Sequence, residues 1–299
     1  MRVCYAPGYY APVPPGHVFP MGKFQGLHER LLQLGVIRES DVVAPGMCDF
    51  EVIERVHTPR YARAVWTGSL STREVRRLGL PWSRGLGIRS RLAVQGTVLA
   101  ARMALEDGVA GNLAGGTHHA MPDRGEGFCV YNDVAVSCLD LRARGYEGRI
   151  LVLDCDVHQG NGTAQILTGR PGVFTASLHG ARNYPFHKPP SDLDVGLPDR
   201  TGDRAYRQAL EDALDRIAAV FKPDLVFYLA GIDPLAEDRF GRLSLTTAGL
   251  EERDRTVLRW CSDHGAAVAI LLSGGYAPTL AETVDAHALA FKAAREILP

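Results

Sequence analysis

The sequence lacks paired cysteines, long apolar runs and an excess of charge of either sign, and each absence argues against a class of protein. Its six cysteines include no C-x-x-C pair, which disfavours both a disulfide framework and a cysteine-based metal site. No apolar run approaches the roughly 18 residues of a membrane span, and the proline-rich N-terminus lacks the apolar core of a signal peptide. Lys plus Arg total 33 against 34 for Asp plus Glu, so no excess charge attracts nucleic acid or an anionic membrane. We therefore expect a cytoplasmic protein with neither nucleic acid nor membrane as a partner.

Signs of a domain boundary are missing as well. Proline, glycine and serine do not cluster in the middle of the chain, and no charge run or low-complexity tract interrupts it. With 46% hydrophobic residues, the 299-residue chain has enough apolar mass for one large core. We expect a single domain that spans residues 1–299.

The order of the apolar segments indicates the fold class. Apolar runs with the length of strands occur at residues 2–5, 109–114, 150–153, 173–176, 225–229 and 268–272. Helical periodicity is present at residues 26–34, 91–106, 132–144, 203–221, 246–264 and 279–297. Continuous apolar strands that alternate with helices are typical of a parallel sheet covered on both faces. The sequence therefore predicts an α/β fold with a mostly parallel sheet, whose ligand site lies beyond the carboxyl ends of the strands.

Side chains that can bind a metal follow two of the predicted strands. Asp156 and His158 stand two residues apart where the strand at 150–153 ends, so an extended backbone directs both to the same side. Asp233 follows the strand at 225–229 and is the natural third ligand. One imidazole and two carboxylates leave a coordination position open, as catalytic zinc sites do. Taken alone, the Asp-x-His tripeptide is more often a hydrogen-bonded pair at a strand end.

Groups suited to proton transfer and charge stabilisation follow other predicted strands. His118 and His119 come after a Gly-Gly turn, and they are either a general base near a metal or a pair of surface histidines. Tyr276 also follows a Gly-Gly pair, and its hydroxyl can donate to a developing oxyanion, although such a tyrosine alone is more often structural. Asn161 stands between two glycines, where it is either part of a turn before a helix that starts near Thr163 or a residue that orients a histidine.

Five blocks with reactive residues at their centres cover the chain from about residue 17 to its end: GGTHHAMPDRGEGFCVYNDVAV, LVLDCDVHQGNGTAQ, SLHGARNYPF, LAGIDPLAEDRFGRLSLT and SGGYAP. In this order they resemble the histone deacetylase family. The segments FPMGKF, HQGNG and NYPF are most similar to class IV and its bacterial relatives. The resemblance implies an arginase-like three-layer α/β/α sandwich and a zinc-dependent hydrolase that deacylates an N-acyl amine by attack of a metal-activated water.

The resemblance also implies a role for the motif residues. Asp156, His158 and Asp233 match the ligands of one zinc ion per chain. His118 and His119 match the tandem histidines of the family, with the second as general base and later general acid.

The partners of the histidines show one departure from the family pattern. Asp154 matches the carboxylate that pairs with the first histidine. The partner of the second is Asn161, where class I members have Asp, so His119 should be less basic than in an Asp-paired enzyme. Tyr276 matches the tyrosine that stabilises the oxyanion and argues for catalytic competence.

Further matches concern the substrate tunnel and a second ion. Phe128 and Tyr184 match the two aromatic walls of the tunnel, and Gly127 and Gly275 line the same slot. The resemblance also implies a structural K⁺ or Na⁺, held by the Ser177 hydroxyl and by the backbone carbonyls of Asp154, Asp156, His158 and Leu178.

Two other functions compete with deacylation. A binuclear-manganese ureohydrolase of the same fold needs carboxylates at two positions that are Gly160 and Gly231 here, and glycine has no side chain to ligate a second metal. An acyl-amine-binding module with little turnover would not need Tyr276 or the tandem histidines.

The substrate is the least determined feature. Acylated lysine, acetylpolyamines and other small-molecule acyl-amines are candidates, and the oligomeric state is open, with dimers common among polyamine-type relatives. A polyamine enzyme should have an acidic gate, for which the candidate rim acids are Glu54, Asp123, Glu126 and Asp238. The loop at 6–20 is expected to form part of the rim, with Tyr9, Tyr10 and His17.

Overall fold

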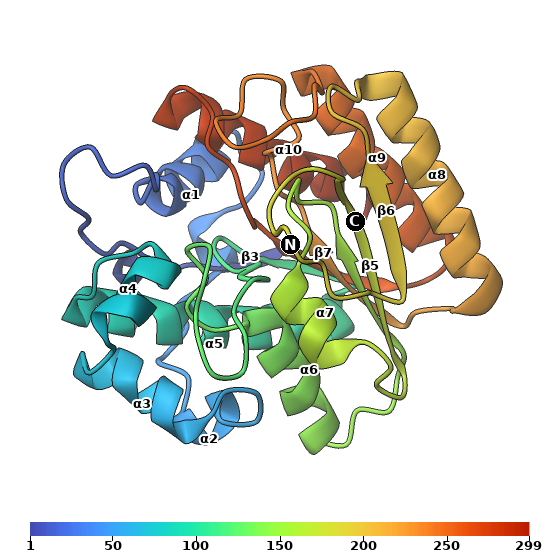
Figure 1. Ribbon diagram of the computed structural model, residues 1–299. Helices are drawn as coiled ribbons and strands as arrows, with labels where there is room; N and C mark the ends of the chain where they lie inside the picture. The colour runs from blue at the N-terminus through green and yellow to red at the C-terminus, as the bar shows by residue number, and fades with distance from the viewer. Residues whose placement is uncertain (299) are drawn as a thin grey trace.

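The computed structural model describes residues 1–298 and places their strands in one sheet (Figure 1). The strand order is β2-β1-β3-β8-β7-β4-β5-β6, and every paired strand runs parallel to its neighbour. The strands are β1 Arg2–Cys4, β2 Val42–Val43, β3 Val109–Asn112, β4 Ile150–Asp154, β5 Val173–Gly180, β6 Leu193–Leu197, β7 Leu225–Leu229 and β8 Ala267–Leu271. The predicted parallel sheet is confirmed.

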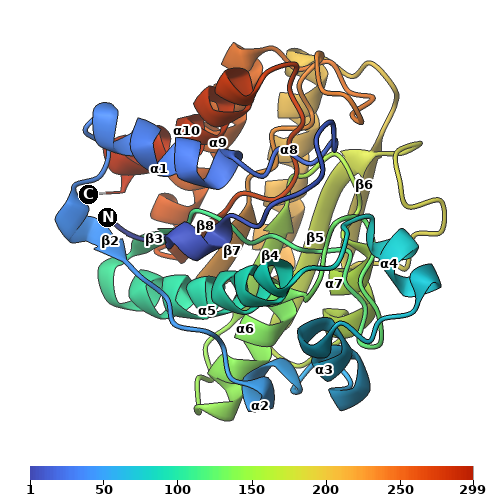
Figure 2. The same cartoon turned by 90° about the vertical axis from the view of Figure 1, so that its left-hand side faces the viewer.

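Helices cover both faces of this sheet (Figure 2). They are α1 Lys23–Gln33, α2 Phe50–Ile53, α3 Pro59–Thr67, α4 Thr72–Leu78, α5 Arg84–Asp107, α6 Asp133–Ala143, α7 Asn161–Leu167, α8 Asp203–Val220, α9 Thr247–Asp263 and α10 Leu280–Ile297. Helices α1, α8, α9 and α10 lie on one face, and α5, α6 and α7 lie on the other (Figures 1 and 2). The predicted three-layer α/β/α sandwich is therefore confirmed. Within residues 1–298, none of these helices combines the length and the apolar composition that a membrane crossing needs.

The sheet is held by apolar strands, and its helices begin at polar caps. Every residue of the central strands β4 and β7 is buried, as expected for strands covered by helices on both faces. The side chain of Ser83 accepts a hydrogen bond from the Leu86 amide at the start of α5, and Thr279 forms a capping box with Glu282 at the start of α10. Because the strands are parallel, the loops that lead from the carboxyl ends of strands to the starts of helices lie at the same edge of the sheet.

A buried histidine joins the segment before α3 to the loop before α6. His57 Nδ1 lies 3.0 Å from the carbonyl oxygen of Met121, and the backbone amide of Asn132 donates to His57 Nε2 at 2.9 Å. This pair of contacts fixes the neutral form with hydrogen on Nδ1. Burial lowers the pKa of His57 to about 4.

Several short elements were not predicted from the sequence pattern. The edge strand β6 has the burial pattern of a half-exposed strand, and its sequence LDVGL contains too few apolar residues to stand out. The helices α2, α3 and α4 have between 4 and 9 residues, which is too short for a clear helical period. The predicted helix start near residue 163 was close, because α7 begins at Asn161.

Candidate active site

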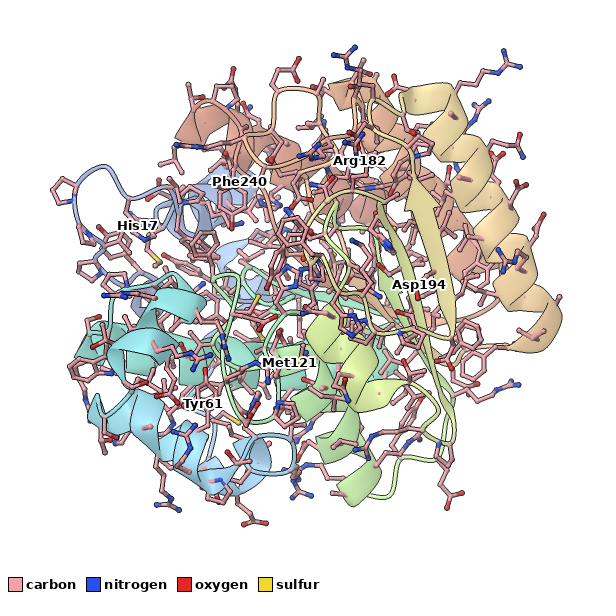
Figure 3. The ribbon with its side chains drawn as sticks, in the orientation of Figure 1. His17, Tyr61, Met121, Arg182, Asp194 and Phe240 are labelled. Atoms are coloured by element: carbon pink, nitrogen blue, oxygen red, sulfur yellow. The ribbon has the colours of Figure 1, made fainter. Side chains whose placement is uncertain are left out.

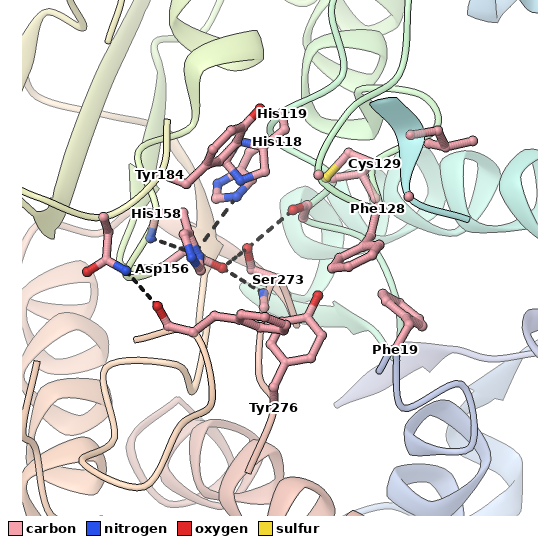
Figure 4. A pocket seen from close by; sticks show the side chains of 18 of the residues that line it. Phe19, His118, His119, Phe128, Cys129, Asp156, His158, Tyr184, Ser273 and Tyr276 are labelled. Atoms are coloured by element: carbon pink, nitrogen blue, oxygen red, sulfur yellow. Dashed lines mark hydrogen bonds and ion pairs between the residues drawn. The ribbon is translucent and has the colours of Figure 1, made fainter. Parts of the chain in front are cut away.

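Three of the predicted residues converge beyond the carboxyl ends of β4 and β7, and Figure 4 shows two of them, Asp156 and His158. Asp156 and His158 follow β4, Asp233 follows β7, and their ligand atoms all lie within 4.8 Å of one another. His158 Nδ1 is 3.0 Å from Asp156 Oδ1 and 3.2 Å from Asp233 Oδ2. The parallel register of β4 and β7 brings the two strand ends side by side, so this set of one nitrogen and two oxygens can hold a metal ion.

The electrostatics of this cluster fit a cation. Asp156 and Asp233 are buried at 1% and 0% exposure, and an unpaired buried carboxylate is costly. Burial and the neighbouring Asp156 carboxylate raise the pKa of Asp233 to about 7. Burial lowers the pKa of His158, but its contacts with the two carboxylates outweigh this effect and raise that pKa to about 10. Two buried carboxylates beside one imidazole therefore form a donor set that suits a cation.

The cluster has room for no further side chain. A Cβ at Gly231 would lie 2.8 Å from Asp156 Oδ2 and 3.0 Å from Asp233 Oδ1. A Cβ at Gly274 would lie 2.2 Å from Asp233 Oδ2. These contacts are shorter than real Cβ contacts, so the backbone packs directly against the carboxylates. No side chain from position 231 or 274 therefore enters this cluster.

The tandem histidines follow β3 and have different partners. His118 Nδ1 is 2.6 Å from Asp154 Oδ2, and His119 Nδ1 is 2.7 Å from Asn161 Oδ1. Although burial lowers the pKa of His118, the carboxylates of Asp154 and Asp156 raise it to about 9. Burial and the charges of His118 and His158 hold the pKa of His119 well below its usual range. His118 is therefore protonated near neutral pH, whereas His119 is neutral and can accept a proton.

The histidines and the metal cluster open into a cavity of about 470 Å³. Gly127, Phe128 and Tyr184 line it as predicted, together with Tyr276. Figure 4 shows His119 and Tyr184 on one side of this cavity, across from Phe128 and Phe19. Among the described residues that line it, Gly275 is not included, although its neighbours Gly274 and Tyr276 are. Gly274 lines the cavity, and the place of Gly275 in the tunnel stays a prediction.

Comparison with known proteins identifies the family. Residues 17–291 match the histone deacetylase domain. This chain belongs to the histone deacetylase family. Histone deacetylase 2 of Arabidopsis thaliana is 28% identical over 277 residues, which cover 90% of this chain and 72% of that protein. The acetoin utilization protein AcuC of Bacillus subtilis is 28% identical over 281 residues, which cover 87% of this chain and 72% of that protein.

Two further similarities concern a whole-length relative and the fold. An uncharacterised protein of Picosynechococcus is 46% identical over 295 residues, which cover 99% of this chain and 98% of that protein. The crystal structure of the HDA15 HD domain matches with a TM-score of 0.81 at 23% identity, over 99% of this chain and 91% of that chain. The second similarity shows the fold alone. Membership in the histone deacetylase family supports amide deacylation as the general chemistry.

Two buried residues hold the active site of this histone deacetylase family member from behind: Asp238, which was expected at the rim, and Arg253, which did not stand out in the sequence. Asp238 Oδ2 accepts a hydrogen bond from the Tyr276 backbone amide at 2.7 Å, which ties this tyrosine to the loop after β7. Arg253 on α9 donates to the carbonyl oxygen of Gly231 at 2.5 Å and to that of Cys155 at 3.3 Å. Arg253 therefore joins the two segments that carry the metal-binding residues.

Two buried cations line the cavity and were also missed. Lys23 Nζ donates to the carbonyl oxygen of Ser273 at 3.1 Å, and burial lowers its pKa to about 8. The Arg89 guanidinium lies 4.6 Å from the centroid of the Phe24 ring, and burial lowers its pKa to about 10. Within residues 1–298 neither cation forms an ion pair with a carboxylate. The two cations therefore line the cavity without a direct carboxylate contact, although the carboxylates of Asp233 and Asp156 act on Lys23 from a greater distance.

The candidate rim acids are not a gate. Glu54 Oε1 lies 3.3 Å from Arg63 Nη2, and Asp123 Oδ1 lies 2.9 Å from Arg124 Nη1. Asp238 is buried behind Tyr276, and Glu126 is buried beside Asn161. Among the described residues that line the cavity, Asp156 is the sole carboxylate. Sequence position placed these acids near the motifs but could not show which way they point.

The exposed part of the cavity is basic and aromatic instead. Arg77, Arg182 and Arg242 line it and are exposed, and Phe186, which follows Tyr184 and Pro185, is 96% exposed. Figure 3 shows that Arg182 and Phe240, which come from different segments, both lie in the upper half of the view. Asp199 lies 3.5 Å from Arg182 and 3.3 Å from Arg242, so it neutralises part of this charge.

The loop at 6–20 is divided between core and cavity. Tyr9 is fully buried and donates to Asn112 Oδ1 at 2.7 Å, so its predicted place at the rim is wrong. Tyr10 is exposed, and His17 contacts the carbonyl oxygen of Gly79 at 3.0 Å. The residue of this loop region that lines the cavity is Phe19.

The predicted monovalent-cation site remains a prediction. The register of β4 and β5 sets Asp154 beside Ser177, and Ser177 Oγ lies 3.0 Å from His179 Nδ1. Asp154, Ser177 and Leu178 are buried, which is compatible with a structural ion.

Proposed function

We propose that this protein is a zinc-dependent deacylase that hydrolyses the amide bond of an N-acyl amine, and that residues 1–299 act as one catalytic domain. Its family membership supports deacetylation in general. The observation that carries the proposal is that one cavity brings His119 and Tyr276 next to the cluster of Asp156, His158 and Asp233. A binding module without turnover has no use for this combination.

The metal would be held by Asp156, His158 and Asp233, a donor set that is typical of a catalytic zinc site. When bound, zinc polarises the amide carbonyl and lowers the pKa of water. Asp156 is kept in place by hydrogen bonds that its Oδ2 accepts from Ser273 Oγ at 2.7 Å and from the Gly274 amide at 2.6 Å. These contacts orient the carboxylate before any ligand arrives.

The proton transfers are assigned to His119. Its Nδ1 donates to Asn161 Oδ1, so Nε2 keeps a free lone pair that can accept the proton of the attacking water. The same nitrogen then protonates the leaving amine. The hydrogen bond between His118 and Asp154 fixes the orientation of the first imidazole beside His119.

Stabilisation of the oxyanion is assigned to the hydroxyl of Tyr276. Burial raises the pKa of its hydroxyl well above the usual range, so the group remains a hydrogen-bond donor at neutral pH. A donor fixed in this position stabilises the negative charge that develops on the carbonyl oxygen.

The charges of the cavity support a substrate class. An acetylpolyamine carries further ammonium groups, which the exposed arginines Arg77, Arg182 and Arg242 would repel. An acylated lysine that is flanked by neutral or acidic residues of a peptide has no ammonium group that these arginines would repel. Lys23 and Arg89 attract the carboxylate product that hydrolysis releases. We therefore favour acyl-lysine, or a small acyl-amine without extra positive charge, over acetylpolyamines.

The test is a substrate panel with the zinc-loaded protein. Acetyl-lysine peptides with acidic flanks, the same peptides with basic flanks, a long-chain acyl-lysine peptide and acetylspermidine are compared by kcat/KM. We expect the acidic peptides to be turned over fastest and acetylspermidine slowest. Arg242→Gln should reduce the preference for acidic flanks, while Arg216→Gln, an exposed arginine on α8, should leave it unchanged. A preference for acetylspermidine would contradict the substrate class, and the absence of turnover on the whole panel would favour the binding module.

The proposal also includes a structural monovalent cation and a single catalytic metal. A structural K⁺ or Na⁺ would be held behind the active site by Ser177 and the neighbouring backbone carbonyls. A second metal, which a ureohydrolase needs, is disfavoured by the close packing at Gly231.

A further inference from the structure

Glu126 is a buried carboxylate in the active site that the proposed mechanism does not use. The side chain of Glu126 is 11% exposed, and its Oε1 accepts a hydrogen bond from Asn161 Nδ2 at 2.7 Å. The same oxygen accepts a second hydrogen bond from the Tyr184 hydroxyl at 2.9 Å. Its other oxygen, Oε2, lies 3.4 Å from Arg124 Nε. The carboxylate therefore faces Asn161, the partner of His119, and the tunnel-wall tyrosine donates its hydroxyl hydrogen to Glu126.

The loop that carries Glu126 packs directly on the general base. Gly127 has a φ of 57°, and a Cβ there would lie 2.7 Å from His119 Cδ2. The loop can approach the imidazole ring this closely because position 127 is glycine. Glu126 is thus placed by the backbone beside the residue that it affects.

The carboxylate decides how the Asn161 amide is oriented. A carboxylate only accepts hydrogen bonds, so Asn161 must present its NH₂ group to Glu126 and its carbonyl oxygen to His119. That oxygen in turn accepts from Nδ1 of His119 and leaves Nε2 without hydrogen. A carboxylate on the NH₂ side also polarises the amide, which increases the negative charge on Asn161 Oδ1.

We propose that Glu126 is a positioning residue of the deacylase: through Asn161 it fixes the tautomer of His119 and supplies the negative charge that an aspartate at position 161 would supply directly. The proposal rests on the proposed function, because it concerns the base of that reaction. It places a carboxylate one hydrogen bond behind the uncharged partner Asn161, from which a less basic His119 is expected.

Isosteric substitutions separate charge from shape. Glu126→Gln keeps the volume and can still accept from Asn161 and Tyr184, so it removes the charge together with the ion pair to Arg124. Asn161→Asp adds a charge, but it places two carboxylates 2.7 Å apart when Glu126 is present. In the double variant E126Q/N161D the charge moves from position 126 to position 161, and the amide introduced at the first position can donate to the carboxylate introduced at the second.

The experiment measures kcat and KM of the zinc-loaded wild type, both single variants and the double variant on the best substrate of the panel. We expect E126Q to lower kcat by about 10-fold with little change in KM, which is a part of what a general base contributes. We expect N161D to be impaired as well, and the double variant to recover most of the wild-type kcat. Glu147→Gln, an exposed position between α6 and β4, is the matched control and should have the wild-type kcat.

The outcomes separate the role of Glu126 from the proposed function. A kcat of E126Q equal to that of an active wild type would overturn the role of Glu126 and leave the proposed function standing. A double variant no better than E126Q would also overturn it, because a role in packing alone gives no reason for rescue by charge. An inactive wild type would overturn the proposed function and this inference together. Melting curves and zinc content of each variant verify that kcat reports on correctly folded, loaded protein.

Discussion

Removal of the Tyr276 hydroxyl tests how much this single group contributes to stabilising the oxyanion, because the rest of the site is left unchanged. The ring of Tyr276 packs against Phe19, Phe128 and Phe240, with centroid distances of 6.2, 5.9 and 4.9 Å. Its backbone amide is held by Asp238. Tyr276→Phe preserves these contacts, so we expect the folding free energy to change by less than about 1 kcal/mol.

The expected loss of activity follows from the number of donors removed. Tyr276 supplies one hydroxyl to the oxyanion, and loss of one such donor lowers kcat by roughly 100- to 1,000-fold, or about 3–4 kcal/mol of transition-state stabilisation. KM should change little, since the interaction is stronger in the transition state than with bound substrate.

The assay compares kcat, KM, zinc content and melting temperature of Tyr276→Phe with those of the wild type. We expect a large fall in kcat with zinc content and melting temperature preserved. A kcat within about threefold of the wild type would refute the assigned role of Tyr276, because one lost donor should cost far more. A fall in kcat that accompanies a loss of zinc would refute it as well, because the tyrosine would then act on the metal site.

Two further predictions concern the metal ligands and the response to acid. Asp156→Ala should lower both zinc content and kcat, the latter by at least about 100-fold; a zinc-replete variant with normal kcat would show that Asp156 is not a ligand. Acid should destabilise the fold through His57, whose pKa falls from 6.5 to about 4 on folding, so the unfolded state binds the proton first as the pH drops. Between pH 7 and pH 4 the wild type should lose about 3 kcal/mol more unfolding free energy than His57→Gln in urea titrations, and equal losses would contradict this.

The strand-end residues of the site were predictable because the fold restricts where they can be. Continuous apolar strands implied a parallel sheet, and all parallel strands present their carboxyl ends at one edge. Asp156 and Asp233 follow two strands of that sheet, so their convergence required only that β4 and β7 be neighbours. The structure shows that they are.

Residues on long loops were not predictable in the same way. Glu126 stands between two glycines in the sequence GEG, and it was expected at an acidic rim, whereas the loop turns its carboxylate inward to Asn161. Tyr9 was expected at the rim and is buried against Asn112. In both cases the direction of the side chain depends on contacts with segments distant in the sequence, which a local pattern does not contain.

The most direct test of the account is a zinc titration of the metal-free protein during turnover. Zinc is added in steps while the release of acetate from an acetyl-lysine peptide is followed. We predict that the rate rises in proportion to added zinc and reaches its plateau at one zinc per chain. A plateau at two metals per chain, or no release of acetate at any zinc level, would contradict the proposal of a mononuclear deacylase.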